Sequence, residues 1–372
     1  MKPVRIILSG GGTGGHLYPA AATAEALERR LGSGVELLFV GAEGKMEMEK
    51  IPALGYHIKG LPVAGLVRSL SPRNIARNLC LPVKVVRSVS KAADIIRSFG
   101  ADAVAGFGGY ASAPVLLAAQ RMGIPTVIQE QNSYAGLTNK ILGRRARTVC
   151  VAYEGMDRFF AQDKIVMTGN PLRGTFSSCT DRAAALEYFG FSADKPVVLV
   201  VGGSLGTRTL NEMMKRHVDD IVAKGSMQLI WQTGRYYSAE MDEFMRGRAE
   251  AGIWRSAFIE RMDYAYAASD LVISRSGACT VSELCIAGKP TIFVPSPNVA
   301  EDHQTKNAMA LVGRGAARMV PDREAVEKLI PLAESMLADK AQLAELSRRI
   351  SQLAIPDSAD RVAEQILKVI KA

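Results

Sequence analysis

The stretch VRIILSGGGTGGH, residues 4–16, joins an apolar run to a turn with five glycines in six positions. Gly10, Gly12 and Gly15 satisfy the spacing G-x-G-x-x-G between a predicted strand and a predicted helix. Such a turn lets a phosphate approach the main chain at a helix N-terminus, where N–H groups and the helix dipole favour an anion. The alternative is a tight strand–helix turn without a ligand, and this motif alone does not decide between them.

The same strand–turn arrangement recurs along the chain, at GFGGY (106–110), GGSLG (202–206) and SGA (276–278). Other apolar runs predict strands at 35–41, 126–130, 148–152, 227–234, 256–260 and 290–295. The runs are continuous rather than alternating, which is typical of parallel strands covered on both faces, and helical patterns lie between them. We therefore predict an α/β fold of two Rossmann-like, doubly wound domains, with a cleft between them lined by main-chain N–H groups.

The domain boundary is predicted near GNPLR, residues 169–173, because Asn170-Pro171 favours a turn and ends a helix. This gives one domain of residues 1–168 plus 353–372 and another of residues 169–352. The last helical pattern, from about residue 358, would return to the first domain.

The formal net charge is +9, and the whole excess of cations lies in residues 1–168. The excess is densest between residues 68 and 97, where apolar residues lie among seven cations and one acid, Asp94. The cations are Arg68, Arg73, Arg77, Lys84, Arg87, Lys91 and Arg97. This composition suits a surface that rests on anionic lipid headgroups, although a core-facing helix with a solvated basic face is the alternative. Nucleic acid is not expected as a partner, since the stretch has no aromatic residues for base stacking.

Several classes of protein are excluded by what the sequence lacks. There is no Walker A motif and no D-x-D pair, so we expect no metal site and no cofactor. Five cysteines without a C-x-x-C pair predict free thiols in a reducing compartment. Neither the first residues nor the uncharged stretch 103–120 predicts a signal peptide or a spanning helix, so a soluble, cytoplasmic protein is expected.

Seven motifs carry a resemblance, in the order GGGTGGH, GFGGY, EQN with AGLTNK, GNPLR, GGSLGTRTLN, RSGACTVSE and DHQTKNA. Together they resemble the peptidoglycan N-acetylglucosaminyltransferases, inverting enzymes of glycosyltransferase family 28 with the GT-B fold. The resemblance covers essentially the whole chain. It implies transfer of N-acetylglucosamine from UDP-N-acetylglucosamine to lipid I, the muramyl-pentapeptide pyrophosphoryl-undecaprenol, to give lipid II. It also implies a peripheral place on the cytoplasmic membrane face and a part in cell-wall biogenesis, cell shape and cell division.

The resemblance assigns the donor chiefly to the second domain. Gly203 and Ser204 would contact its diphosphate, and Glu283 its ribose hydroxyls. The sugar hydroxyls would be read by Gln304 and Asn307. The full donor set is Thr13, Gly14, Gly15, Asn132, Arg173, Gly203, Ser204, Ile259, Met262, Glu283, Gln304 and Asn307, with Ile259 and Met262 in the uracil-holding segment.

The resemblance assigns the acceptor to the first domain, at Thr13, His16, Tyr110, Gln131 and Asn139. His16 is our predicted general base, because it lies at a helix start and histidine titrates near neutral pH. It could instead only bond the loop or a phosphate, and Glu130 is the second candidate base. Lys140, Arg144 and Arg145 would join the membrane-facing surface.

Three other functions fit parts of the sequence. A nicotinamide dehydrogenase would use the first glycine turn, with Glu43 on the ribose. A non-catalytic protein that binds nucleotide-sugars or phospholipids, and a GT-B epimerase, would also use repeated glycine turns.

Overall fold

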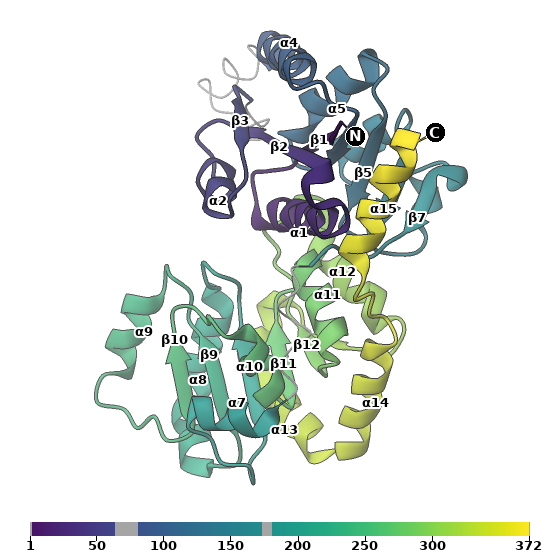
Figure 1. Cartoon of the computed structure of the whole chain (residues 1–372). Helices are drawn as coiled ribbons and strands as arrows, with labels where there is room; N and C mark the ends of the chain where they lie inside the picture. The colour runs from purple at the N-terminus through teal and green to yellow at the C-terminus, as the bar shows by residue number, and fades with distance from the viewer. Residues whose placement is uncertain (1, 64–80, 173–180, 372) are drawn as a thin grey trace. The chain divides into compact units, whose positions relative to one another are not determined.

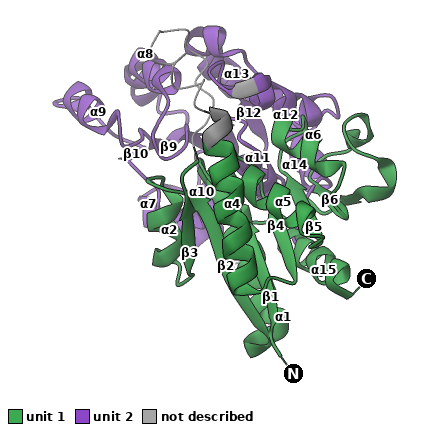
Figure 2. Cartoon of the chain, turned by 90° about the horizontal axis from the view of Figure 1, so that it is seen from above, with its two compact units in different colours: residues 1–173, 357–372 green, residues 174–356 purple. Residues whose placement is uncertain are grey.

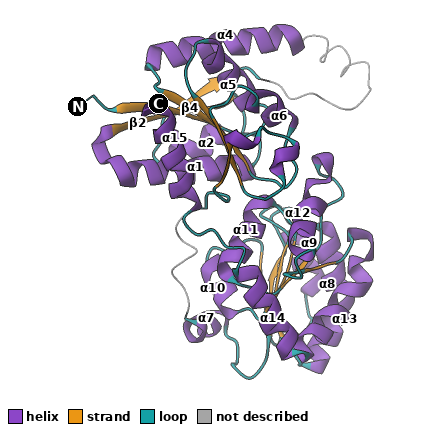
Figure 3. Ribbon diagram, turned by 90° about the vertical axis from the view of Figure 1, so that its right-hand side faces the viewer, coloured by secondary structure: helices purple, strands orange, loops and turns teal. Residues whose placement is uncertain are grey.

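The computed structural model describes residues 2–63, 81–172 and 181–371. It divides into two compact units, residues 1–173 with 357–372 and residues 174–356 (Figure 2). The divisions fall a few residues from the boundaries at 168/169 and 352/353 predicted above. In each unit, helices cover both faces of a parallel sheet (Figure 3), so the predicted α/β class with two Rossmann-like domains is confirmed.

The sheet of the first unit has seven parallel strands in the order β3-β2-β1-β4-β5-β6-β7. The strands are β1 (Val4–Ser9), β2 (Val35–Ala42), β3 (Ile58–Leu61), β4 (Ala103–Gly106), β5 (Thr126–Glu130), β6 (Thr148–Val151) and β7 (Ile165–Met167). The helices are α1 (Gly14–Leu31), α2 (Glu47–Ala53), α4 (Leu81–Phe99), α5 (Ser112–Arg121), α6 (Leu137–Gly143) and α15 (Ser358–Lys371).

Alternate residues of β1 are buried in two different cores, which explains its continuous apolar run. Ile6 and Leu8 belong to a core that includes α1 and α15, whereas Ile7 belongs to one that includes α4 and α5. All three side chains are fully buried. The last helix, α15, packs against α1 through residues such as Val362 and Ile366, so the chain's end belongs to the first unit (Figure 1).

The sheet of the second unit has six parallel strands in the order β10-β9-β8-β11-β12-β13. The strands are β8 (Val197–Val201), β9 (Gln228–Gln232), β10 (Ile253–Ser256), β11 (Leu271–Ser274), β12 (Thr291–Phe293) and β13 (Arg318–Met319). The helices are α7 (Arg182–Phe189), α8 (Arg208–Lys224), α9 (Ser238–Met245), α10 (Met262–Ala268), α11 (Ala278–Ala287), α12 (His303–Val312), α13 (Ala325–Ala338) and α14 (Lys340–Ser351).

One predicted strand was misplaced and three were missed, and all four lie at sheet edges. The strand predicted at 256–260 is β10, which lies at Ile253–Ser256. The missed strands are β3, β7 and β13. An edge strand pairs on one side only and is less completely buried, so its sequence lacks the continuous apolar run of a central strand.

The four glycine turns follow the four strands that flank the switch points of the two sheets. In the first unit the turns follow β1 and β4, which are paired, while β2 lies on the other side of β1. In the second unit they follow β8 and β11, which are also paired. Parallel sheets bind ligands beyond the carboxyl ends of strands at such a point, so each unit presents one candidate site.

Candidate functional site

The first glycine turn ends at α1, and its cap residue leaves the helix N-terminus open. Thr13 has extended backbone geometry and makes no side-chain capping bond, and no acidic residue lies in the first turn of the helix. The Thr13 and Gly15 positions are exposed, while Gly14 is partly so. The arrangement suits an anion, because peptide dipoles at a helix start leave partial positive charge there.

His16 is held at this turn by its ring nitrogen Nδ1. That atom lies 3.1 Å from Thr13 Oγ1 and 3.2 Å from the main-chain oxygen of Gly11. A carbonyl oxygen can only accept, so the bond to Gly11 requires the proton on Nδ1. The neutral ring then carries its lone pair on Nε2, the nitrogen that a general base would use.

The second glycine turn, after β4, packs directly against the first. A Cβ atom on Gly108 would lie 3.0 Å from Cδ2 of His16, and one on Gly109 would lie 2.3 Å from the Gly11 oxygen. Both glycines have positive φ. On the other side, the Tyr110 ring lies 3.2 Å from the place of a Cβ on Gly12. Thr13, His16 and Tyr110, all predicted for the acceptor, therefore meet at one place.

Glu47 completes this turn, and the sequence reasoning missed it. The side chain is fully buried, and its carboxylate accepts hydrogen bonds from Gly12 N at 3.2 Å and Ala42 N at 3.0 Å. Burial and the charge of Glu47 raise the pKa of Tyr110. Gly11 and Gly41 make room for this side chain, because a Cβ on either residue would overlap Glu47. These two glycines are the only trace of the contact in the sequence.

Glu130, at the end of β5, accepts four hydrogen bonds from its own loop. Oε1 accepts from Asn132 N at 3.0 Å and Nδ2 at 3.3 Å, and Oε2 accepts from Gly136 N at 3.0 Å and Asn139 Nδ2 at 2.8 Å. The side chain is 2% exposed, and this burial raises its pKa despite the four bonds. The bonds place Asn132 and Asn139 beside it. They favour a role in holding the loop over proton transfer.

Gln131 connects this loop to the second glycine turn. Its amide Nε2 donates to the main-chain oxygen of Phe107 at 2.7 Å, and the side chain is 2% exposed. The buried Gln129 donates to Asn170 Oδ1 at 3.0 Å, which ties the segment around Asn170 to β5. Two of the predicted acceptor residues, Gln131 and Asn139, are joined because both donate to Gln129 O.

In the second unit, the third turn exposes Gly203 and Ser204 shortly before α8 begins at Arg208. Gly206 packs on Gly234, which follows β9, so closely that a Cβ on Gly234 would lie 2.0 Å from Cα of Gly206. Thr207, the cap residue, turns its hydroxyl back to Gly202 O at 3.0 Å instead of capping the helix. The N-terminus of α8 therefore resembles that of α1.

The fourth turn is joined to α12. Ser276 Oγ donates to Gln304 O at 2.8 Å, and Asn307 Nδ2 donates to Ser276 O at 3.3 Å. The Gln304 side chain accepts from Ser296 N at 2.9 Å. The predicted sugar-reading residues Gln304 and Asn307 are therefore positioned by the turn after β11.

Arg275 is a second residue that the sequence reasoning missed. It pairs with Asp322 at 2.6 Å and donates to Val294 O at 2.8 Å, and its Nε lies 3.4 Å from Thr207 Oγ1. Its side chain is only 14% exposed. Arg275 thus links the third and fourth turns to the end of β12. Its position in the sequence, directly before the fourth glycine turn in RSG (275–277), was the feature that could have indicated a role at the site.

Glu283 lies on α11 and meets α10, the helix that follows the predicted uracil-holding segment. Tyr266 donates its hydroxyl to Glu283 Oε2 at 3.3 Å. Burial raises the pKa of Glu283 to about 7, while the bond from Tyr266 lowers it. Ile259 is 2% exposed, and Met262 begins α10. Arg173 lies outside the described residues.

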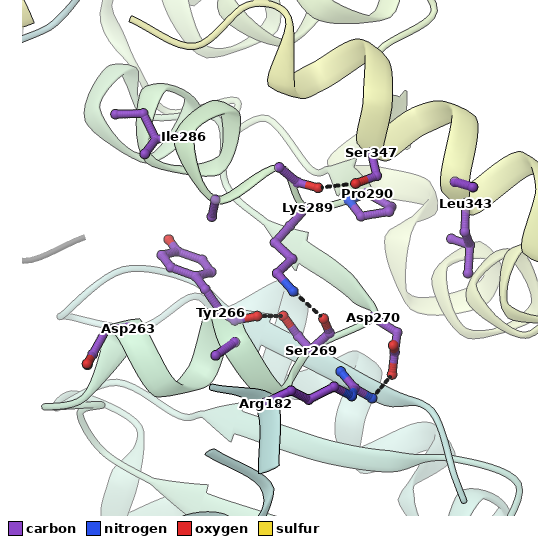
Figure 4. A pocket seen from close by; sticks show the side chains of 14 residues that line it. Arg182, Asp263, Tyr266, Ser269, Asp270, Ile286, Lys289, Pro290, Leu343 and Ser347 are labelled. Atoms are coloured by element: carbon purple, nitrogen blue, oxygen red, sulfur yellow. Dashed lines mark hydrogen bonds and ion pairs between the residues drawn. The ribbon is translucent and has the colours of Figure 1, made fainter. Parts of the chain in front are cut away.

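A pocket of about 680 Å³ lies at the opposite, N-terminal edge of this sheet (Figure 4). Lys289 donates there to Ser269 O at 2.9 Å, and Arg182 pairs with Asp270 at 2.8 Å. Burial lowers the pKa of Lys289 to about 8. None of the predicted donor residues lines this pocket, but Tyr266 does.

The first unit carries an apolar surface edged by cations, which we call the α4–α6 patch. A cavity of about 300 Å³ opens there between α4, α5 and α6, and Tyr110 is among its lining residues. Lys84, Val85, Leu137 and Ile141 line this cavity and are exposed. The patch is defined by these four residues and by the exposed residues close to them in the chain, Val86, Arg87 and Arg144.

Only part of the predicted basic stretch contributes to this patch. Lys91 pairs with Glu43 at 2.6 Å and Arg97 with Asp94 at 2.9 Å. Lys140 lies over the Tyr134 ring, 3.9 Å from its centroid, and Arg145 lines another cavity. The predicted residues Arg68, Arg73 and Arg77 lie outside the described residues.

Comparison with known proteins gives matches over both units. Residues 6–151 match the glycosyltransferase family 28 N-terminal domain, and residues 197–362 match its C-terminal domain. A protein of Parabacteroides distasonis is 50% identical over 371 residues, covering all of this chain and 99% of its own length. Its name is UDP-N-acetylglucosamine–N-acetylmuramyl-(pentapeptide) pyrophosphoryl-undecaprenol N-acetylglucosamine transferase. A Bacteroides thetaiotaomicron protein with the same name is 49% identical, with the same coverage.

Solved structures agree on the fold. The crystal structure of Acinetobacter baumannii MurG matches with a TM-score of 0.77 and 31% identity, over 98% of this chain and all of that one. The calicheamicin glycosyltransferase CalG4 matches with a TM-score of 0.72 over all of this chain and 99% of that one. At 16% identity, that second likeness concerns the fold alone.

Proposed function

This chain belongs to glycosyltransferase family 28, and we propose that it transfers N-acetylglucosamine from UDP-N-acetylglucosamine to lipid I, forming lipid II. It is a hexosyltransferase, as its relatives are named. The observation that carries the proposal is the 50% identity over the whole chain to an enzyme named for this reaction. Glycine turns lie at the switch points of both sheets and could bind the two substrates, because each substrate carries a diphosphate.

We assign the donor to the second unit. The exposed residues Gly203 and Ser204, in the turn that precedes α8, suit the diphosphate of UDP. Glu283 is suited to the ribose hydroxyls, because an ionised carboxylate acts only as an acceptor and a hydroxyl can donate to it. Gln304 and Asn307 would read the sugar, and the main chain around Ile259 and Met262 the uracil. Arg173, Thr13, Gly14, Gly15 and Asn132 complete the proposed donor set.

We assign the acceptor to the first unit. The open N-terminus of α1, with Thr13, would receive the acceptor diphosphate. Tyr110 lies beside Gly12 and also lines the cavity of the α4–α6 patch, so it is placed between a phosphate turn and an apolar surface. Gln131 and Asn139 would support this site through the loop that they hold.

The proposed reaction is one in-line displacement. The acceptor hydroxyl oxygen forms a bond to the anomeric carbon while the bond from that carbon to the UDP oxygen breaks, which inverts the configuration. The hydroxyl proton passes to Nε2 of His16, and the electron pair of the broken bond leaves with UDP. Helix N-termini, main-chain N–H groups and Ser204 stabilise the negative charge on UDP. Glu130 remains the second candidate for the base, and its four hydrogen bonds count against it.

We propose that the α4–α6 patch rests on anionic lipid at the cytoplasmic membrane face, where lipid I would be reached. In the described part of the chain, no helix is long and apolar enough to cross a bilayer. The patch combines four exposed apolar side chains with three exposed cations, which suits headgroups and the acyl boundary beneath them. Cell shape and cell division would depend on the protein through lipid II supply.

Transfer of labelled sugar tests the reaction directly. Purified protein with UDP-[¹⁴C]N-acetylglucosamine and a short-chain lipid I analogue should give a labelled lipid product, with one UDP released per sugar transferred. Release of free sugar or of an epimer without lipid product would contradict the proposal. Absorbance at 340 nm with NADH should not change, since Glu43 pairs with Lys91 and is not set up to hold a cofactor ribose.

A further inference from the structure

Tyr266 connects two parts of the proposed donor site that lie apart in the sequence. It sits on α10, which begins at Met262 in the segment assigned to the uracil, and it reaches Glu283 on α11. The hydroxyl lies 3.3 Å from Glu283 Oε2, and the side chain is 4% exposed. Tyr266 thus donates to one of the two carboxylate oxygens of Glu283.

The hydrogen bond acts in one direction. Burial and the neighbouring charge of Glu283 raise the pKa of Tyr266 well above 10, so the phenol keeps its proton and donates. Glu283 is therefore the acceptor, and the bond favours its ionised form against the opposing effect of burial. An ionised carboxylate is the form that accepts from a sugar hydroxyl.

Tyr266 is buried beside a pocket. It lines the pocket of about 680 Å³ at the N-terminal edge of the sheet, where Ile286 and Lys289 are also found (Figure 4). The bond from its hydroxyl to Glu283 joins α10 to α11. The carboxylate is held by the tyrosine at one of its two oxygens.

We infer that Tyr266 is a positioning residue for donor recognition: its hydroxyl holds Oε2 of Glu283 so that the other carboxylate oxygen, Oε1, accepts from a ribose hydroxyl. The inference rests on the proposed function, which assigns the ribose to Glu283. Tyr266 itself touches neither the donor nor the reacting atoms. Its influence should therefore be confined to nucleotides that carry ribose hydroxyls and should pass through Glu283.

Binding of two nucleotides to four variants tests this. Isothermal titration would compare UDP with 2′,3′-dideoxyuridine diphosphate for Tyr266→Phe, Glu283→Ala, the double variant and Tyr264→Phe. Tyr264 is the matched control, because it lies on the same helix and its ring packs on Tyr188 and Arg261 instead. Thermal unfolding of each variant would show that it folds.

Tyr266→Phe should weaken UDP binding about tenfold, since a hydrogen bond to a charged group is lost, and should change dideoxy-UDP binding less than twofold. Glu283→Ala should weaken UDP binding at least tenfold, and the double variant should equal it within twofold. In turnover, Tyr266→Phe should raise KM for the donor and leave kcat unchanged.

Equal loss for both nucleotides, or additive losses in the double variant, would overturn the inference and leave the donor assignment standing. Unchanged UDP affinity in Glu283→Ala would instead refute the ribose assignment itself, and the inference with it.

Discussion

In the first unit, Glu130 accepts four hydrogen bonds from its own loop, whereas in the second unit Glu283 accepts from Tyr266 on another helix. Both carboxylates are buried enough for their pKa to be raised. The sheets of the two units have the same topology around the switch point. The difference shows that burial alone does not mark a ligand-binding carboxylate: Glu130 is saturated by its chain, and Glu283 keeps the capacity to accept from a substrate.

The first prediction separates the chemistry of one unit from donor binding by the other. His16→Ala should lower kcat by about 10² to 10⁴-fold, because a positioned general base is lost. Its Kd for UDP should stay within twofold of the wild type. The exposed His57, also in the first unit, provides a control in His57→Ala, which should leave both quantities unchanged. Intact turnover in His16→Ala would remove His16 from the reaction.

The second prediction tests whether Glu130 is structural. Glu130→Gln keeps the volume but replaces one accepting oxygen with an amide that must face two donors. We expect the free energy of unfolding to fall by about 2 to 4 kcal/mol, as two bonds to a charged acceptor are lost. Urea denaturation at pH 8 measures it. An unchanged midpoint would mean that the loop does not depend on these bonds.

The third prediction is that the same substitution at Glu283 raises the free energy of unfolding instead of lowering it. Its folded pKa of about 7 lies above its ordinary value of 4.5, so the folded state loses stability as pH rises from 4.5 to 7 and remains penalised above that. Glu283→Gln should therefore stabilise the unliganded protein at pH 8, by about 2 to 3 kcal/mol, while UDP binding weakens. Near pH 4 the two proteins should be equally stable. Destabilisation at pH 8 would show that Glu283, like Glu130, serves the fold.

The fourth and smallest effect concerns the α4–α6 patch of the first unit. Lys84→Ala or Arg87→Ala should each weaken binding to vesicles with anionic lipid by about 1 kcal/mol, which is roughly fivefold. Lys328→Ala, an exposed position in the second unit, is the matched control and should have no effect. Vesicle flotation at low and high salt measures this. Vesicle binding that is unchanged in both Lys84→Ala and Arg87→Ala would contradict the proposal for the patch.

The central strands and their turns could be predicted from sequence because both faces of those strands are buried. Ile6, Ile7 and Leu8 show why: each is fully buried, but in two different cores, so no polar residue interrupts the run. The edge strand β10 was misplaced because all of its residues are only partly buried. The signal weakens where burial does.

The side chains that complete the site could not be predicted in the same way. Glu47 reaches Gly12 from 35 positions away, and Tyr266 reaches Glu283 from 17. Arg275 joins Thr207 and Asp322, which are far apart in the chain. These partners are set by tertiary packing, and neither spacing nor periodicity records them. The motifs located the turns, and the structure supplied the groups that hold them.

A crystal structure with UDP-N-acetylglucosamine tests the division of labour between the units most directly. The account predicts the donor diphosphate at the Gly203–Ser204 main chain and the ribose hydroxyls on Glu283, with Tyr266 still bonded to the other carboxylate oxygen. A nucleotide found with its diphosphate in the turn of Gly10–Gly15 and its ribose away from Glu283 would contradict it.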